Sequence, residues 1–169
     1  TKKRNKLLYQ SEHDELTGLY NKRSLNRYLE DVFEACKLNE KELGILFLDI
    51  DYFKQLNDRY GHGKGDEGIC AVADTLKRIF PEDYVARYGG DEFLVVMPER
   101  DLTYAMEHAK LLCAGIRECK IPNEDSEVEP WLTISVGGVC AIPKEPNRVW
   151  DFLSAADTTL YEQKKEQKG

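Results

Sequence analysis

The stretch LGILFLDI, residues 43–50, is a short and almost unbroken apolar run. A run of this length is typical of a β-strand that is covered on both of its faces. Two aspartates, Asp49 and Asp51, stand at its carboxyl end. We therefore expect a central strand over 43–50 that brings acidic side chains to one end of a sheet.

The sequence around this strand alternates between helical and strand-like patterns. Upstream, apolar residues recur at helical spacing over 22–38, and Asn21 stands where an N-cap belongs. Downstream, we expect a helix from about Phe53, and then a loop over GHGKGD, 61–66, because three glycines occur within five residues. A second helix follows and ends at Pro81.

The remaining segments complete a sheet with helices on it. YVARY (84–88) and FLVVM (93–97) flank Gly89-Gly90 and predict a β-hairpin whose glycines supply the positive φ values of a tight turn. Further along we expect a helix over 101–119, a charged loop over 122–130, a strand over 132–140 and a last helix over 147–167. The expected fold class is α/β in the α+β sense, with a central, mostly antiparallel sheet flanked by helices.

The composition fits one folded domain. The chain has 169 residues, of which 41% are hydrophobic, and this share is large enough for a core. The 31 acidic and 24 basic residues give a net charge of -7, which argues against a protein that coats nucleic acid or an anionic membrane. We therefore expect no nucleic-acid partner and no membrane contact. A nucleotide held through a bridging metal ion remains open.

The cysteines indicate a reducing compartment. There are five, an odd number, and no CxxC motif occurs. We expect free thiols in a cytoplasmic protein, and the sequence shows no secretory signal peptide. Since the chain starts at Thr1, we expect it to be a piece of a longer protein, whose other parts are free to attach it to a membrane.

Four carboxylates are candidates for chemistry: Asp49, Asp51, Asp91 and Glu92. Residues two apart in a strand face the same side, so Asp49 and Asp51 share a site if the strand continues, whereas a helix start at 51 turns Asp51 away. If the hairpin lies beside the central strand, Asp91 and Glu92 approach Asp49. Such a cluster favours Mg²⁺ and phosphates. The alternative is that these are ordinary strand-end and turn acids.

Three polar residues follow the strand closely and are candidates for binding a base: Asn57, His62 and Asp66. An asparagine and an aspartate together can read the edge of guanine, because the carboxylate accepts from the N1–H and from the exocyclic amine. Adenine does not offer these donors in that arrangement. The alternative for His62 is a loop residue that makes a local hydrogen bond.

Four blocks of the sequence stand in the order and spacing of a known family. They are DELTGLYNKR, FLDIDYFKQLND, YGHGKGDE and RYGGDEF, and ADTTLYEQK at 156–164 adds a fifth. On these motifs the chain resembles the GGDEF domains, the diguanylate cyclases, over residues 12–165. The signature Gly89-Gly90-Asp91-Glu92-Phe93 is intact.

The resemblance implies a fold similar to the palm-type catalytic domain of nucleotidyl cyclases, here over residues 14–169. It implies that residues 1–13 are a helical linker from a missing upstream sensor domain. It also implies that two GTP molecules are condensed into cyclic di-GMP and two pyrophosphates across a homodimer. The implied cofactor is Mg²⁺ or Mn²⁺, with two ions per active site.

The resemblance also implies roles for individual residues. By similarity, the metal ligands are Asp49, the main-chain carbonyl of Ile50, Asp91 and Glu92. Asp91 is implied as the proton acceptor, and Glu92 as a helper with the second metal or the developing charge. The implied substrate-binding residues are Asn57 and Asp66 for guanine, with His62 nearby, Phe53 and Lys54 for the phosphates, and Lys164 for the terminal phosphate.

One departure from the family pattern concerns feedback inhibition. Many members have an RxxD product site, but the matching tetrapeptide here begins with Phe80 and ends with Asp83. Inhibition by product at that site is therefore not expected. The alternative to an active cyclase is a catalytically inactive GGDEF domain that acts as a nucleotide receptor or a dimerisation module. An intact signature with a broken RxxD favours the cyclase.

Overall fold

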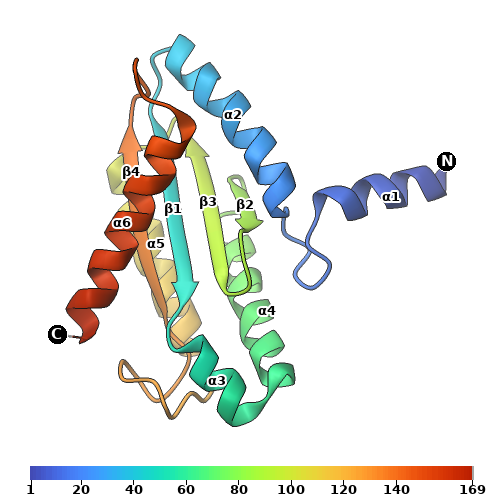
Figure 1. Ribbon diagram of the computed structural model, residues 1–169, viewed down its shortest axis with the longest axis vertical. Helices are drawn as coiled ribbons and strands as arrows, with labels where there is room; N and C mark the ends of the chain where they lie inside the picture. Colours follow the sequence, from blue (N-terminus) through green and yellow to red (C-terminus); the bar gives the residue numbers. More distant parts are fainter. Residues whose placement is uncertain (169) are drawn as a thin grey trace.

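The strand β1 (Leu43–Ile50) is an inner strand of a four-stranded sheet in the computed structural model, with strand order β2-β3-β1-β4 (Figure 1). Its neighbours are β3 (Glu92–Pro98) and β4 (Ile134–Ala141), and β2 (Tyr84–Arg87) lies outside β3. All three pairings are antiparallel. The predicted fold class and the central position of 43–50 are confirmed.

The structure describes the backbone of residues 1–168 and the side chains of residues 1–160. The helices of this part are α1 (Lys2–Glu12), α2 (Lys22–Leu38), α3 (Phe53–Tyr60), α4 (His62–Ile79), α5 (Leu102–Glu118) and α6 (Val149–Lys168). The predicted cap is confirmed, because the Asn21 side chain accepts from the amide of Ser24.

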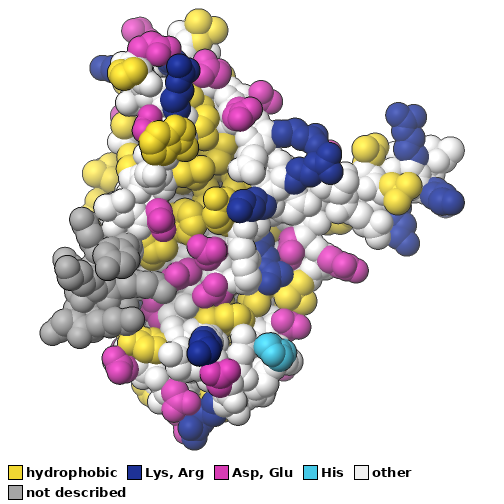
Figure 2. Space-filling model, in the orientation of Figure 1, with side chains coloured by type: hydrophobic (Ala, Val, Ile, Leu, Met, Phe, Trp, Pro, Cys, Tyr) yellow, Lys and Arg dark blue, Asp and Glu magenta, His cyan; other side chains and the backbone are white. Residues whose placement is uncertain are grey.

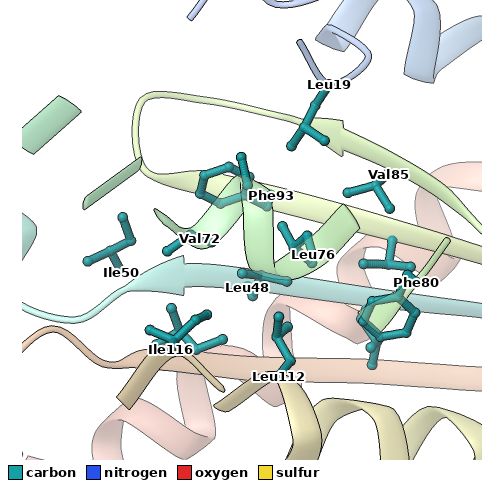
Figure 3. Close-up of a cluster of buried hydrophobic side chains, with 14 of the residues drawn as sticks. Leu19, Leu48, Ile50, Val72, Leu76, Phe80, Val85, Phe93, Leu112 and Ile116 are labelled. Atoms are coloured by element: carbon teal, nitrogen blue, oxygen red, sulfur yellow. The ribbon is translucent and has the colours of Figure 1, made fainter. Parts of the chain in front are cut away.

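Both faces of the sheet are covered, which explains the unbroken apolar run of β1. Leu46, Leu48 and Ile50 belong to a core cluster with residues of α4 and α5, and Figure 3 shows Leu48 among side chains of these helices. Ile45 and Phe47 alternate with them and pack toward α2 and α6 on the other face. The apolar area buried on both faces is the main favourable contribution to stability.

The predicted loop over 61–66 is wrong, because α4 already begins at His62. Gly61, with φ of 89°, alone makes the break between α3 and α4. Gly63 and Gly65 lie inside the helix. Gly65 is buried and faces the side chain of Asn57, so it is needed for a close approach of α3 and α4 rather than for a loop.

The predicted hairpin forms, but its glycines do not have the positive φ values expected of them. The connection is longer than a two-residue turn, and the amides of Tyr88 and Gly89 both donate to the carbonyl of Glu92. At Gly89 the missing side chain matters instead, since a Cβ there would displace Oε1 of Glu92 from its position. Gly89 thus leaves room for the folded-back side chain of Glu92, whereas a Cβ at Gly90 would meet nothing within 4 Å.

The predicted helix within residues 1–13 is confirmed as α1, which extends away from the sheet (Figure 1) and buries none of its side chains. A stack of five rings fastens its end to the edge of the sheet. Tyr9, His13, Tyr20, Tyr84 and Tyr28 follow one another with centroid separations of 3.9, 4.7, 4.2 and 3.9 Å. Burial, and then the neighbouring tyrosines, raise the pKa of Tyr84.

The turn after α1 is held by the ionised side chain of Asp14. Its carboxylate accepts from the amide and hydroxyl of Thr17 and forms an ion pair with Arg87 at 3.2 Å. Burial raises the pKa of Asp14, but the hydrogen bonds from Thr17 and the charge of Arg87 together outweigh it and leave the pKa below its usual value. The folded state therefore binds a proton at Asp14 less readily than the unfolded chain does.

We expect the Asp14→Asn variant to be less stable than the wild-type chain near neutral pH, with a difference that shrinks in acid. Because the folded-state pKa is depressed, the stabilisation is complete above the unfolded pKa of about 4 and is lost as the pH falls through the folded value. Urea unfolding between about pH 6 and pH 3 measures this. The adjacent exposed Glu15→Gln is the control, and a difference independent of pH would contradict the assignment.

The five cysteines are all free thiols, as predicted. Within the part of the chain that the structure describes, every helix is too short or too polar to pass through a bilayer.

Candidate functional site

The carboxyl end of β1 meets the start of β3. Antiparallel pairing sets Asp49 directly opposite Glu92. The next amide, of Ile50, donates to the carbonyl of Asp91 at 3.2 Å. Asp91 and Glu92 therefore lie beside Asp49, as the sequence predicted. Figure 2 shows acidic side chains on the molecular surface over this lower part of β1.

The side chain of Arg87 stabilises the turn that carries Asp91. Its Nη2 donates to the carbonyl of Gly90 at 2.8 Å, and its Nε donates to the carbonyls of Gly89 and Gly90 at 3.1 and 3.2 Å. The same guanidinium pairs with Asp14. The Arg87 side chain thus links the segment after α1 to the signature turn. We did not predict this link, although both residues stand in the quoted sequence blocks.

Asp51 does not lie with Asp49, Asp91 and Glu92. Of the two predicted alternatives, the one in which its side chain turns away from Asp49 is correct. Its carboxylate is buried and accepts from the hydroxyls of Thr133 at 2.7 Å and of Ser135 at 2.5 Å. Both hydroxyls come from the β4 side of β1. The helix start is not the cause, because α3 begins only at Phe53. Instead, the two hydroxyls satisfy a charge that would be costly to bury alone.

The donors at the end of β1 suit a hard divalent cation. Asp49 and Asp91 supply carboxylates, and Ile50 between them supplies a main-chain carbonyl. Mg²⁺ prefers such oxygen ligands and commonly leaves part of its shell to water and phosphates. Among residues 1–160, no three His, Cys, Asp or Glu side chains gather into a metal-binding group. What the structure shows of this group is the neighbouring backbone positions of Asp49, Asp91 and Glu92, set by the pairing of β1 with β3.

The N-terminus of α3 adjoins this acidic end. Tyr52, directly before α3, gives no side-chain cap. The first amides of a helix have no partner within the helix, so those of Phe53 and Lys54 are available to an anion. Lys54 is exposed and Phe53 half-buried. Both predicted phosphate residues thus stand in the first turn of α3, which begins three residues after Ile50.

The predicted base-binding residues lie on both sides of the α3–α4 junction. Asn57, on α3, is half-buried, and its Oδ1 is buried without a hydrogen-bond partner among the side chains described. Gly65 faces that oxygen. His62 and Asp66 lie at the start of α4, and both are exposed. A buried amide oxygen without a hydrogen-bond partner is a group that a polar ligand can satisfy.

One predicted substrate residue, Lys164, lies outside the residues whose side chains are described, although its backbone belongs to α6.

The position of the RxxD arginine is occupied by Phe80. Its side chain is 1% exposed and part of the core, so it cannot bind a ligand as an arginine would. The Asp83 carboxylate accepts from the Tyr104 hydroxyl at 2.6 Å. Burial, and then this hydrogen bond, raise the pKa of Tyr104 to about 12.

The chain is similar to known proteins along most of its length. Residues 11–169 match the family model described as "Diguanylate cyclase, GGDEF domain". The chain is 32% identical over 162 residues to the probable diguanylate cyclase DgcC of Escherichia coli, and 34% identical over 153 residues to the diguanylate cyclase VdcA of Vibrio cholerae. These alignments cover 95% and 89% of this chain. They cover 42% and 43% of the relatives, so the chain spans less than half of their length.

Among solved structures, the fold is similar to the GGDEF domain of DgcB from Caulobacter crescentus, which was determined in complex with c-di-GMP. The TM-score is 0.83 and the sequence identity is 26%. The match covers 92% of this chain and 91% of that one.

Proposed function

The chain belongs to the GGDEF domain family, and on this premise we propose that it is a diguanylate cyclase, which condenses two GTP molecules into cyclic di-GMP and two pyrophosphates. The observation that carries the proposal is the meeting of Asp49 with Asp91 and Glu92 beside the uncapped start of α3. Oxygen ligands for a divalent cation and amides for phosphates are what phosphoryl transfer requires of a protein.

Asp49, Asp91 and the carbonyl of Ile50 would hold Mg²⁺ or Mn²⁺, with two ions per site and Glu92 assisting. When bound, the metal stabilises charge on the reacting phosphate and favours ionisation of the attacking hydroxyl. Asp91 accepts the proton of the 3′-hydroxyl. Because Arg87 binds the carbonyls of Gly89 and Gly90, the Asp91 carboxylate is kept oriented for this transfer.

The rest of the substrate lies along α3 and α4. The amides of Phe53 and Lys54, with the Lys54 ammonium, bind phosphates, and Lys164 reaches the terminal phosphate. Asn57 and Asp66 bind the guanine base, with His62 nearby. Asp66 selects GTP over ATP, because its carboxylate accepts from two donors on the guanine edge and adenine presents a different pattern.

We expect Gly65→Ala to weaken GTP binding about tenfold without loss of the fold. A Cβ at residue 65 would overlap the Asn57 amide, which must then turn away and lose a hydrogen bond to guanine. Calorimetric titration with GTP and Mg²⁺ measures the effect. Gly63→Ala is the matched control, because a Cβ there meets nothing within 4 Å. Equal GTP affinity in the two variants would contradict the placement of the base against Asn57.

The reaction needs two copies of the site. The 3′-hydroxyl of each GTP attacks the α-phosphate of the other, so two protomers must face each other with their substrates antiparallel. We propose that residues 1–13 are the end of a linker from an upstream sensor domain, which controls this meeting. The exposed Leu7, Leu8 and Tyr9 of α1 are available for contact with a second chain. In the isolated fragment, the rate of product formation is then limited by the encounter of two protomers rather than by the chemical step.

The test is to incubate the domain at high concentration with GTP and Mg²⁺ and to detect cyclic di-GMP by mass spectrometry. A rate that rises faster than linearly with protein concentration supports catalysis across a transient dimer. The contrary result is absence of product after dimerisation is forced through residues 1–13, together with absence of GTP binding. That result would favour the alternative of an inactive module with a structural role.

A further inference from the structure

The turn between β1 and α3 has an unusual backbone conformation. Tyr52 has φ of 54° and ψ of 39°, which is the left-handed region. A bulky residue rarely adopts this conformation, because its Cβ crowds the backbone, and it persists only where the surroundings impose it. The turn connects the carbonyl of Ile50 to the first amides of α3. Its conformation therefore sets how two parts of the proposed site lie relative to each other.

Asn123 fixes the two carbonyls of this turn. It is 0% exposed, and its Nδ2 donates to the carbonyl of Asp51 at 3.4 Å and to that of Tyr52 at 3.3 Å. The amide of Asn123 in turn donates to the carbonyl of Pro130 at 3.0 Å. A side chain 71 residues away in sequence thus bridges two consecutive carbonyls, and that of Tyr52 also accepts from the amide of Leu56 at 3.1 Å.

Asp51 fixes the same turn from the side of β4. Its amide donates to the carbonyl of Thr133 at 3.0 Å, and its carboxylate accepts from the hydroxyls of Thr133 and Ser135. The residue before Tyr52 is therefore held through its amide, its side chain and its carbonyl. We call Asp51, Asn123, Thr133 and Ser135 the turn brace.

The loop that carries Asn123 also contacts α3 near the C-terminal end of that helix. Arg59 forms ion pairs with Glu124 at 2.6 Å and with Asp125 at 3.3 Å. The hydroxyl of Tyr52 donates to Glu127 at 2.9 Å. These exposed contacts contribute little each. They show that the loop follows α3 along its length, so a shift of the loop is transmitted to the helix.

We propose that Asp51 and Asn123 are positioning residues for the cyclase reaction, because the turn brace holds Tyr52 left-handed and so aims the α3 amides at the phosphates. The proposal rests on the proposed function. Neither side chain touches the reacting atoms. In-line attack depends strongly on the placement of the phosphate, and small displacements reduce the rate sharply. The brace should therefore affect turnover more than nucleotide affinity.

The first test is Asn123→Ala, assayed with forced dimers of the domain. We expect kcat to fall at least tenfold while KM for GTP changes less than threefold. The ¹⁵N amide resonances of Phe53 and Lys54 should shift in the free protein. Asn26→Ala, at an exposed position of α2, should change none of these. A folded Asn123→Ala with kcat within twofold of the wild-type value would overturn the proposal.

The second test separates positioning from a general loss of structure. Glycine adopts the left-handed conformation without strain, so Tyr52→Gly combined with Asn123→Ala should regain at least threefold in kcat over Asn123→Ala alone. A general structural defect would not be relieved at residue 52. Failure of this rescue, with unchanged Phe53 and Lys54 resonances, counts against the brace.

A third variant covers the case in which Asn123→Ala does not fold. Thr133→Val keeps the shape of the side chain but removes one donor to Asp51, and we expect it to shift the Phe53 and Lys54 resonances and to lower kcat severalfold. Unshifted resonances would refute the proposal. If the wild-type forced dimer makes no cyclic di-GMP, the proposed function fails, while the resonances of the free protein still decide whether the brace holds the turn.

Discussion

Asp91→Ala should abolish cyclic di-GMP formation, with a loss of roughly 10³-fold or more in kcat, and leave the domain folded. The side chain is assigned both as a metal ligand and as the proton acceptor, and each role alone contributes orders of magnitude. The fold should survive, because Asp91 is bound to β1 through its main-chain carbonyl, which alanine retains. Product analysis by mass spectrometry and thermal unfolding measure the two effects.

Asp31→Ala is the matched control for Asp91→Ala, since Asp31 is an exposed aspartate on α2, away from the end of β1. It should keep the wild-type turnover. Turnover within tenfold of the wild-type rate in Asp91→Ala would refute the assignment of the metal and proton-transfer roles. Unfolding of Asp91→Ala would mean that the residue also has a structural role that its main-chain contact does not supply.

Gly137→Ala should destabilise the domain by about 3 kcal/mol. Gly137 lies on β4 opposite Phe47, and a Cβ there would run into the backbone of α6 at the Leu160 amide and the Ala156 carbonyl. Side chains can move aside, but a helix backbone held against the sheet cannot do so without losing its packing. Urea unfolding of wild-type and variant domains measures the difference.

Gly63→Ala is the opposite case within the same chain. It lies inside α4 with open space around its Cβ position, so alanine should raise the stability by about 0.5–1 kcal/mol through helix propensity.

If the Gly137→Ala variant proves as stable as the wild-type chain, the close packing of α6 against β4 is incorrect.

Local patterns were sufficient for most of the elements. The apolar run 43–50, the helical spacing over 22–38 and the Asn21 cap all correspond to elements of the structure. These features depend on residues that are close together in the chain, so the sequence alone is enough to predict them. Pairing of the hairpin with β1 was only a condition for bringing Asp91 and Glu92 to Asp49, and the structure shows that this condition is met.

The glycines were interpreted less well. GHGKGD was expected to be a loop, and Gly89-Gly90 was expected to have positive φ, and both predictions are wrong. Glycine has two uses, backbone freedom and the absence of a side chain. At Gly65 and Gly89 the second use applies, because Asn57 and Glu92 occupy the space. Only the three-dimensional packing distinguishes the two.

Residue types and their order in the chain predicted the acidic, amide and polar groups of the proposed site, and their place next to a central strand. The tertiary structure alone decided how each group is used. Asp49 and Asp51 both stand at the end of the apolar run, yet it is Asp51 that accepts from the hydroxyls of Thr133 and Ser135. Asn123 binds the turn from a loop that is distant in sequence. Such contacts join residues more than 70 positions apart, and no local pattern encodes them, because they exist only once the sheet has assembled.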